Sequence, residues 1–145
     1  MRRTRTAEAR PVVSGRPWPL SEEAVVRAAQ TVLRAERRRA LLSLTFVGRD
    51  RMRALNLQWK GKRELTDVLA FALESPGGRL AGDIYICPWA AAREARARGI
   101  PVREELRRLV VHGVLHVLGY DHPSDGHRLD SPMWRRQERY VRSLG

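Results

Sequence analysis

One long apolar stripe restricts the folds open to this chain more than any other feature. Between Pro101 and Gly119, apolar residues recur at helical spacing over a wide face, at Val102, Leu106, Leu109, Val110, Val114, Val117 and Leu118. Proline suits the first turn of a helix, and glycine is a common C-terminal stop. A helix with so wide an apolar face is covered by other elements. We therefore expect a central helix ending near Gly119.

The rest of the pattern predicts an α+β fold. Helical spacing or capping signals predict further helices at about 21–37, 50–59, 88–98 and 132–144, and β-branched runs predict strands at 41–47, 66–73 and 79–87. Ser21 and Asp50 are the expected N-caps, and residues 60–65 are an expected loop. The turn at residues 75–78 predicts that the last two strands form an antiparallel hairpin. A length of 145 residues fits a basic arm at residues 1–10 and one domain at residues 11–145.

The charge of the chain indicates an anionic partner. The formal net charge is +12, carried by 26 Arg but only two Lys, Lys60 and Lys62. Nucleic acid is the commonest partner of such a chain, although an Arg-rich surface without a specific footprint would give the same count.

The sequence also favours a cytoplasmic protein. It has no apolar run long enough for a membrane helix, and no apolar segment follows the basic N-terminus as in a secretory signal. Cys87 is the only cysteine, so we expect no internal disulfide and no disulfide-linked partner. The oligomeric state stays open.

Three of the four histidines have the spacing of a metal site. His112 and His116 stand i, i+4 on the central helix, and His122 follows the helix-ending Gly119 by three residues. One ion can bind both imidazoles of such a pair, and His122 can return to supply a third nitrogen. Three imidazoles leave a fourth tetrahedral position for water, as in catalytic zinc sites, although copper and nickel also bind such ligands. His127 is expected at the surface.

The same spacing occurs in the metzincin peptidases, where Glu follows the first His and acts as the general base. Here that residue is Gly113, which cannot accept a proton from water. Peptide hydrolysis is therefore a weaker hypothesis than cleavage of a phosphodiester. A metal ion can stabilise the charge of the phosphodiester transition state and can lower the pKa of the attacking water or 2′-hydroxyl.

Three segments of the chain resemble the YbeY family of bacterial endoribonucleases. Residues 112–122, HGVLHVLGYDH, resemble its histidine signature, and residues 66–71, TDVLAF, and 81–86, AGDIYI, resemble two of its strands. The resemblance implies a single α+β domain with a helix-flanked four-stranded sheet, and one zinc ion held by His112, His116 and His122. It further implies metal-dependent cleavage of single-stranded RNA in rRNA processing, notably at the 3′ end of 16S rRNA, and a role in ribosome quality control.

The chain departs from the family pattern in the loop before the 66–73 strand. The family arginine linked to RNA cleavage corresponds to Lys60, and the family lysine corresponds to Lys62. Lysine keeps the charge but loses the planar fork that grips a phosphate with two hydrogen bonds. The expected catalytic residues are Lys60, His112, His116 and His122, with Lys60 and Lys62 binding phosphate. A non-catalytic ribosome-associated protein with a structural zinc remains the alternative.

Overall fold

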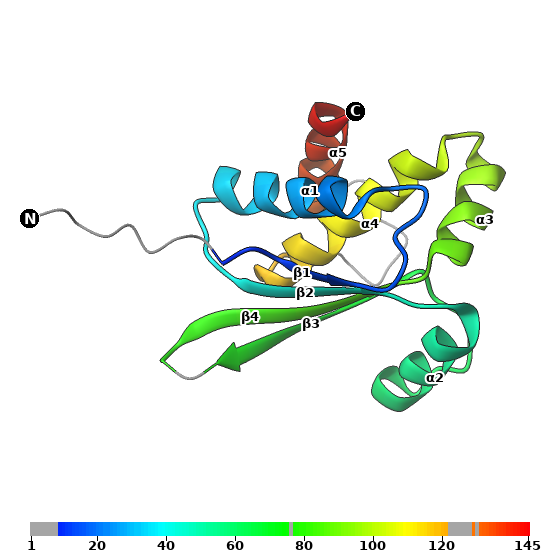
Figure 1. Cartoon of the computed structure of the whole chain (residues 1–145), viewed down its shortest axis with the longest axis horizontal. Coiled ribbons are helices and arrows are strands. Elements are labelled where there is room, and N and C mark those ends of the chain that lie inside the picture. The colour runs from blue at the N-terminus through cyan, green and yellow to red at the C-terminus, as the bar shows by residue number, and fades with distance from the viewer. Residues whose placement is uncertain (1–8, 76, 122–128, 130) are drawn as a thin grey trace, which may run out of the picture.

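The computed structural model describes residues 9–75, 77–121, 129 and 131–145, and within them the predicted α+β fold is confirmed (Figure 1). In chain order the elements are β1 (Val12–Ser14), α1 (Glu22–Ala35), β2 (Leu41–Phe46), α2 (Arg49–Lys60), β3 (Val68–Ser75), β4 (Arg79–Ile86), α3 (Pro88–Arg98), α4 (Val102–Val117) and α5 (Pro132–Leu144). Among the described helices, none is long and apolar enough to cross a membrane.

The four strands form one mixed sheet in the order β1-β2-β4-β3. Strands β1, β2 and β4 run parallel, and β3 pairs antiparallel with β4 from Val68 opposite Ile86 to Ser75 opposite Arg79. The predicted hairpin is therefore confirmed. In this order β3 is an edge strand of the sheet.

One face of the sheet is covered by helices. Alternate strand residues such as Leu44, Ile84 and Ile86 are fully buried on this face, beneath α1 and the central helix α4 (Figure 1). The helix can approach closely because it carries Gly113, where an added Cβ would lie 2.6 Å from Cγ2 of Ile84. Gly113 is thus a packing position turned towards β4.

A smaller core lies on the other face of the sheet. The helix α2 packs there, and Met52 and Leu55 lie in one cluster with Leu69 of β3 and Cys87. Figure 1 shows α2 beside one end of this face, on the side opposite α1 and α4. Phe71 and Tyr85 border the same cluster and are only partly buried.

Three predicted boundaries are wrong. Gly48, with extended backbone, is the N-cap of α2 instead of Asp50, which lies in the first turn where its charge favours the helix dipole. Lys60 is the last residue of α2 and not a loop residue, because Gly61 adopts a left-handed conformation with φ of 68° and ends the helix there. Strand β3 begins at Val68, two residues later than predicted. The Ser21 cap is confirmed, since the backbone N–H of Ala24 donates to its Oγ at 3.0 Å.

Three of the sequence predictions concern residues outside the described ones. They are His122, His127 and residues 1–8 of the basic arm. The last residue of the arm, Arg10, donates from Nη2 to Oε1 of Glu23 at 2.6 Å and so joins α1.

Candidate metal centre and its surroundings

His112 and His116 lie together on one face of α4, as their spacing predicts. Their ring centroids are 6.5 Å apart, and the ring planes differ by 6°. Both side chains are partly buried. The predicted third ligand, His122, lies outside the described residues, and no group of three metal-ligating side chains occurs within the described part of the chain.

A buried glutamine on α5 orients the imidazole of His112. Gln137 is only 1% exposed, and its Nε2 donates to Oε2 of Glu138 at 3.1 Å. The amide oxygen is therefore turned towards His112, where Oε1 lies 2.8 Å from Nδ1. Because this oxygen can only accept, Nδ1 carries the hydrogen, and the neutral imidazole keeps its lone pair on Nε2. Metal-binding histidines are commonly oriented by such a partner on the second ring nitrogen.

His116 has a different environment. Its Nδ1 is buried and has no hydrogen-bond partner among the described residues. An unpaired buried polar atom costs free energy and is rare in folded proteins. An oriented Nε2 on His112 and an unpaired nitrogen on His116 fit a zinc ion, for which imidazole nitrogens are good ligands.

A network of charged side chains holds α5 against α4 and so positions Gln137. Arg108 of α4, with 7% of its side chain exposed, donates to both carboxylate oxygens of Glu138 at 2.8 and 2.9 Å. It also donates to Glu105 at 2.9 Å and Glu104 at 3.1 Å. Burial raises the pKa of Glu138, but the hydrogen bonds from Arg108 and Gln137 outweigh it and lower that pKa. Glu138 thus stays ionised as the acceptor that orients Gln137.

A cavity of about 250 Å³ opens beside His112. It is bounded by α3, α4, α5 and the start of β3, and its lining includes Asp67, Arg98, Glu105 and Trp134. The backbone oxygen of Asp67 accepts a hydrogen bond from the Cys87 N–H at 2.9 Å. The cavity places polar groups of both charges next to the imidazole.

A second buried network fixes the chain just after α4, two residues before His122. The Glu36 carboxylate, with 7% of its side chain exposed, accepts hydrogen bonds from Tyr120 at 2.6 Å, from Arg136 at 2.9 Å and from Tyr140. Burial raises the pKa of Glu36, but these three donors together bring it below its ordinary value. Burial and the same carboxylate raise the pKa of Tyr140 to about 12. The fold therefore anchors the segment that leads to the third predicted ligand.

Lys60 lies on the other side of the edge strand. Its Nζ is 5.6 Å from the ring centre of Phe71, and Phe71 belongs to the sheet face opposite the one that α4 covers. Buried Asn56 holds the loop after Lys60, because its Nδ2 donates to the Glu64 oxygen at 2.8 Å and its backbone oxygen accepts from the Lys62 N–H at 3.4 Å. Strand β3 thus separates Lys60 from the histidine pair.

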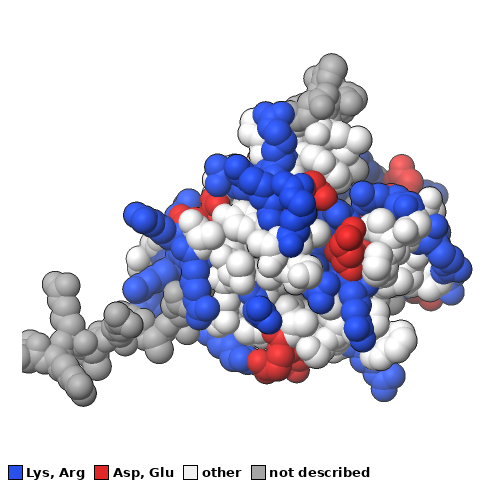
Figure 2. All heavy atoms as spheres, turned by 90° about the horizontal axis from the view of Figure 1, so that it is seen from above, with Lys and Arg blue, Asp and Glu red and all other residues white. Residues whose placement is uncertain are grey.

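Basic residues are scattered over the face of the molecule that carries α1 and α5 (Figure 2). Figure 2 shows these Lys and Arg side chains interrupted by few acidic ones. This distribution matches the expected diffuse positive background more closely than one compact patch.

The comparison with known proteins decides the family. The model of the family described as Endoribonuclease YbeY matches residues 18–145. The chain belongs to the YbeY family. A relative of the same description from Halorhodospira halophila is 33% identical over 92% of this chain and 88% of its own length. Another from Thermobifida fusca is 39% identical over 76% of this chain and 79% of its own length.

Other YbeY relatives have a higher sequence identity, but the match covers a smaller share of each relative's own length. An endoribonuclease YbeY from Anaeromyxobacter sp. is 43% identical over 82% of this chain, and the match spans 62% of that relative. The solution structure of TM1509 from Thermotoga maritima has a TM-score of 0.63, with 26% identity over 92% of this chain and 88% of that one. These comparisons confirm the family and the fold that the histidine and strand motifs predict.

Proposed function

We propose that this YbeY-family chain is a zinc-dependent endoribonuclease that cleaves single-stranded RNA. The observation that carries the proposal is the histidine pair of α4, with Nδ1 of His112 bonded to Gln137 and Nδ1 of His116 buried without a described partner. The +12 charge supports RNA as the substrate. We place the activity in the cytoplasm, in rRNA processing at the 3′ end of 16S rRNA and in ribosome quality control.

Different residues of the chain would bind the zinc ion and the RNA. His112, His116 and His122 would hold one zinc ion, which when bound supplies a Lewis acid and lowers the pKa of a water ligand. Lys60 and Lys62 would neutralise phosphates of the RNA strand on the other side of β3. The dispersed arginines would attract the RNA backbone without reading its sequence.

The packing of α4 disfavours the peptidase alternative. A metzincin-type general base would have to stand at Gly113. That position faces β4, and even a Cβ there would lie 2.6 Å from Ile84. A Glu side chain therefore has no space at this point of the helix, so α4 offers no general base in the metzincin position.

The direct test is cleavage of a fluorescent single-stranded RNA by wild type and by His116→Ala, purified in parallel. We expect the wild type to cut internally and the variant to lose the activity, since one metal ligand is gone. His127→Ala is the matched control and should cut like the wild type. Equal cutting by His116→Ala would contradict the proposal. A wild type that binds zinc but cuts no RNA would instead support the non-catalytic ribosome-associated alternative.

A further inference from the structure

Three aromatic side chains form a continuous surface on the sheet face opposite α4. Trp59 comes from the last turn of α2, Phe71 from β3 and Tyr85 from β4. The ring centres of Trp59 and Phe71 are 5.6 Å apart, and those of Phe71 and Tyr85 are 6.4 Å apart, with interplanar angles of 52° and 68°. We call these three residues the aromatic surface.

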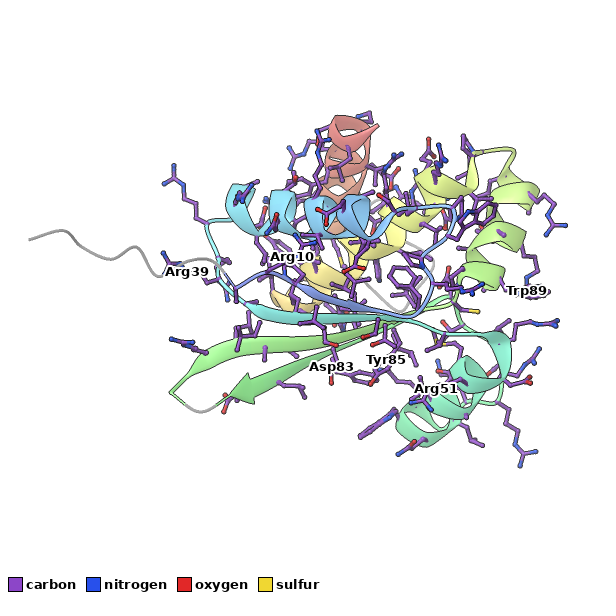
Figure 3. The ribbon with its side chains drawn as sticks, in the orientation of Figure 1. Arg10, Arg39, Arg51, Asp83, Tyr85 and Trp89 are labelled. Carbon is purple, nitrogen blue, oxygen red and sulfur yellow. The ribbon has the colours of Figure 1, made fainter. Side chains whose placement is uncertain are left out.

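The rings of the aromatic surface are more exposed to solvent than core residues are. Trp59 is 58% exposed, and its neighbours Phe71 and Tyr85 are only partly buried at the border of the smaller core. The tilted and edge-on packing shows that the three rings do not stack face to face on one another. Figure 3 shows Tyr85 and Asp83 pointing from β4 away from the helix layer. A group of exposed rings of this kind is typical of a binding surface.

The cation Lys60 beside the aromatic surface favours an anionic ligand with flat apolar groups. Lys60 is adjacent to Trp59 in the chain, and its ammonium lies over Phe71 at 5.6 Å. Asp83 provides an acceptor on the same face and stands opposite Phe71 in the sheet register. Single-stranded RNA matches both features, since its bases stack on aromatic rings while cations follow its phosphates. A duplex matches less well, because its base faces are already stacked.

We propose that the aromatic surface binds bases of single-stranded RNA by stacking, with Trp59 as the main contact and Lys60 holding the adjoining phosphate. This inference rests on the proposed RNA substrate and adds a binding site on the face of β3 opposite the histidine pair. An RNA strand bound there reaches the histidine pair by crossing the edge of β3. The aromatic surface therefore selects unpaired RNA before the strand enters the cleavage site.

The test measures binding separately from cleavage. A fluorescent oligouridylate is titrated with His116→Ala protein, and with wild type from which metal has been removed by a chelator. On each background Trp59→Ala should weaken binding about tenfold, the loss of roughly one base-stacking contact. Trp59→Phe should retain most of the affinity. Trp18→Ala, which removes a tryptophan that is 77% exposed elsewhere, is the matched control and should bind like its parent.

An abasic oligonucleotide of the same length identifies the contact. Without bases, the substitution of Trp59 should no longer matter, and the salt dependence of binding should be the same with and without Trp59. Equal oligouridylate affinity of Trp59→Ala and its parent would overturn the inference, as would an equal loss for the abasic strand. Neither result concerns cleavage, so the proposed nuclease activity of the wild type is tested separately by the RNA cleavage assay.

Discussion

The substitution Gln137→Leu tests how the fold orients the metal ligand His112. Leucine is close to glutamine in size but removes the acceptor 2.8 Å from Nδ1 of His112 and the donor to Glu138. Loss of such a partner typically lowers metal affinity by about 10- to 100-fold, which corresponds to about 1.4–2.7 kcal/mol. The free energy of unfolding should fall by about 1–3 kcal/mol, because buried polar groups lose their partners.

A second variant separates orientation from stability. In Gln137→Glu a carboxylate still accepts from His112, so zinc affinity should equal or exceed that of the wild type. The same carboxylate lies beside Glu138, and the repulsion between the two should destabilise the apo fold. In this variant zinc affinity is therefore kept or raised while the stability of the apo fold falls.

Competition with a chromophoric chelator measures the zinc affinity of each variant, and urea unfolding of the apo protein measures its stability. Gln58→Leu changes an exposed glutamine on α2 and is the matched control. A folded Gln137→Leu protein with wild-type zinc affinity would contradict this prediction, because the imidazole would then need no orienting partner.

Three further predictions concern packing, pH and charge. Gly113→Ala should lower the free energy of unfolding by about 1–2 kcal/mol, because the contact with Ile84 at 2.6 Å outweighs the gain in helix propensity. The control Gly48→Ala meets no atom within 4 Å and should lower it less. Equal losses in thermal unfolding would contradict this prediction. Glu36 has a lowered pKa, so the unfolded chain binds more protons than the folded one at mildly acidic pH. Stability should therefore fall as the pH drops from about 4.5, the ordinary carboxyl value, towards the folded-state pKa, and Glu36→Gln should flatten the curve. Lys60→Ala should weaken the binding of RNA of any sequence and reduce the slope of log affinity against log salt by about 0.7. Lys60→Arg should keep both the affinity and the slope of the wild type. An unchanged slope in Lys60→Ala would exclude a phosphate contact.

Local signals in the sequence predict most elements of the fold. Ser21 caps α1, the residues around Gly77 turn the hairpin, and glycines end α2 and α3, as each residue type favours. The start of α2 is not predictable from sequence, because Asp50 and Gly48 are both acceptable near a helix start and only the backbone conformation distinguishes them. The His112 and His116 pair could be predicted for the same reason: both residues lie on one regular helix.

The partners of the site could not be predicted, because they depend on packing between distant elements. Gln137 meets His112 across 25 positions of the chain, and Tyr120 meets Glu36 across 84. Sequence spacing carries no signal for such contacts. The position of Lys60 relative to the histidines also depends on which face of β3 carries Phe71, and therefore on the register of the whole sheet.

Metal-dependent RNA cleavage at the histidine site is the core of the proposed function. The most direct measurement is the initial rate of single-stranded RNA cleavage as zinc is added back to chelated wild-type protein. We expect no cleavage without metal and a rate that rises to a plateau at one zinc per chain, with no rise in His116→Ala. Full cleavage by the chelated protein, or an equal rise in the variant, would contradict this expectation.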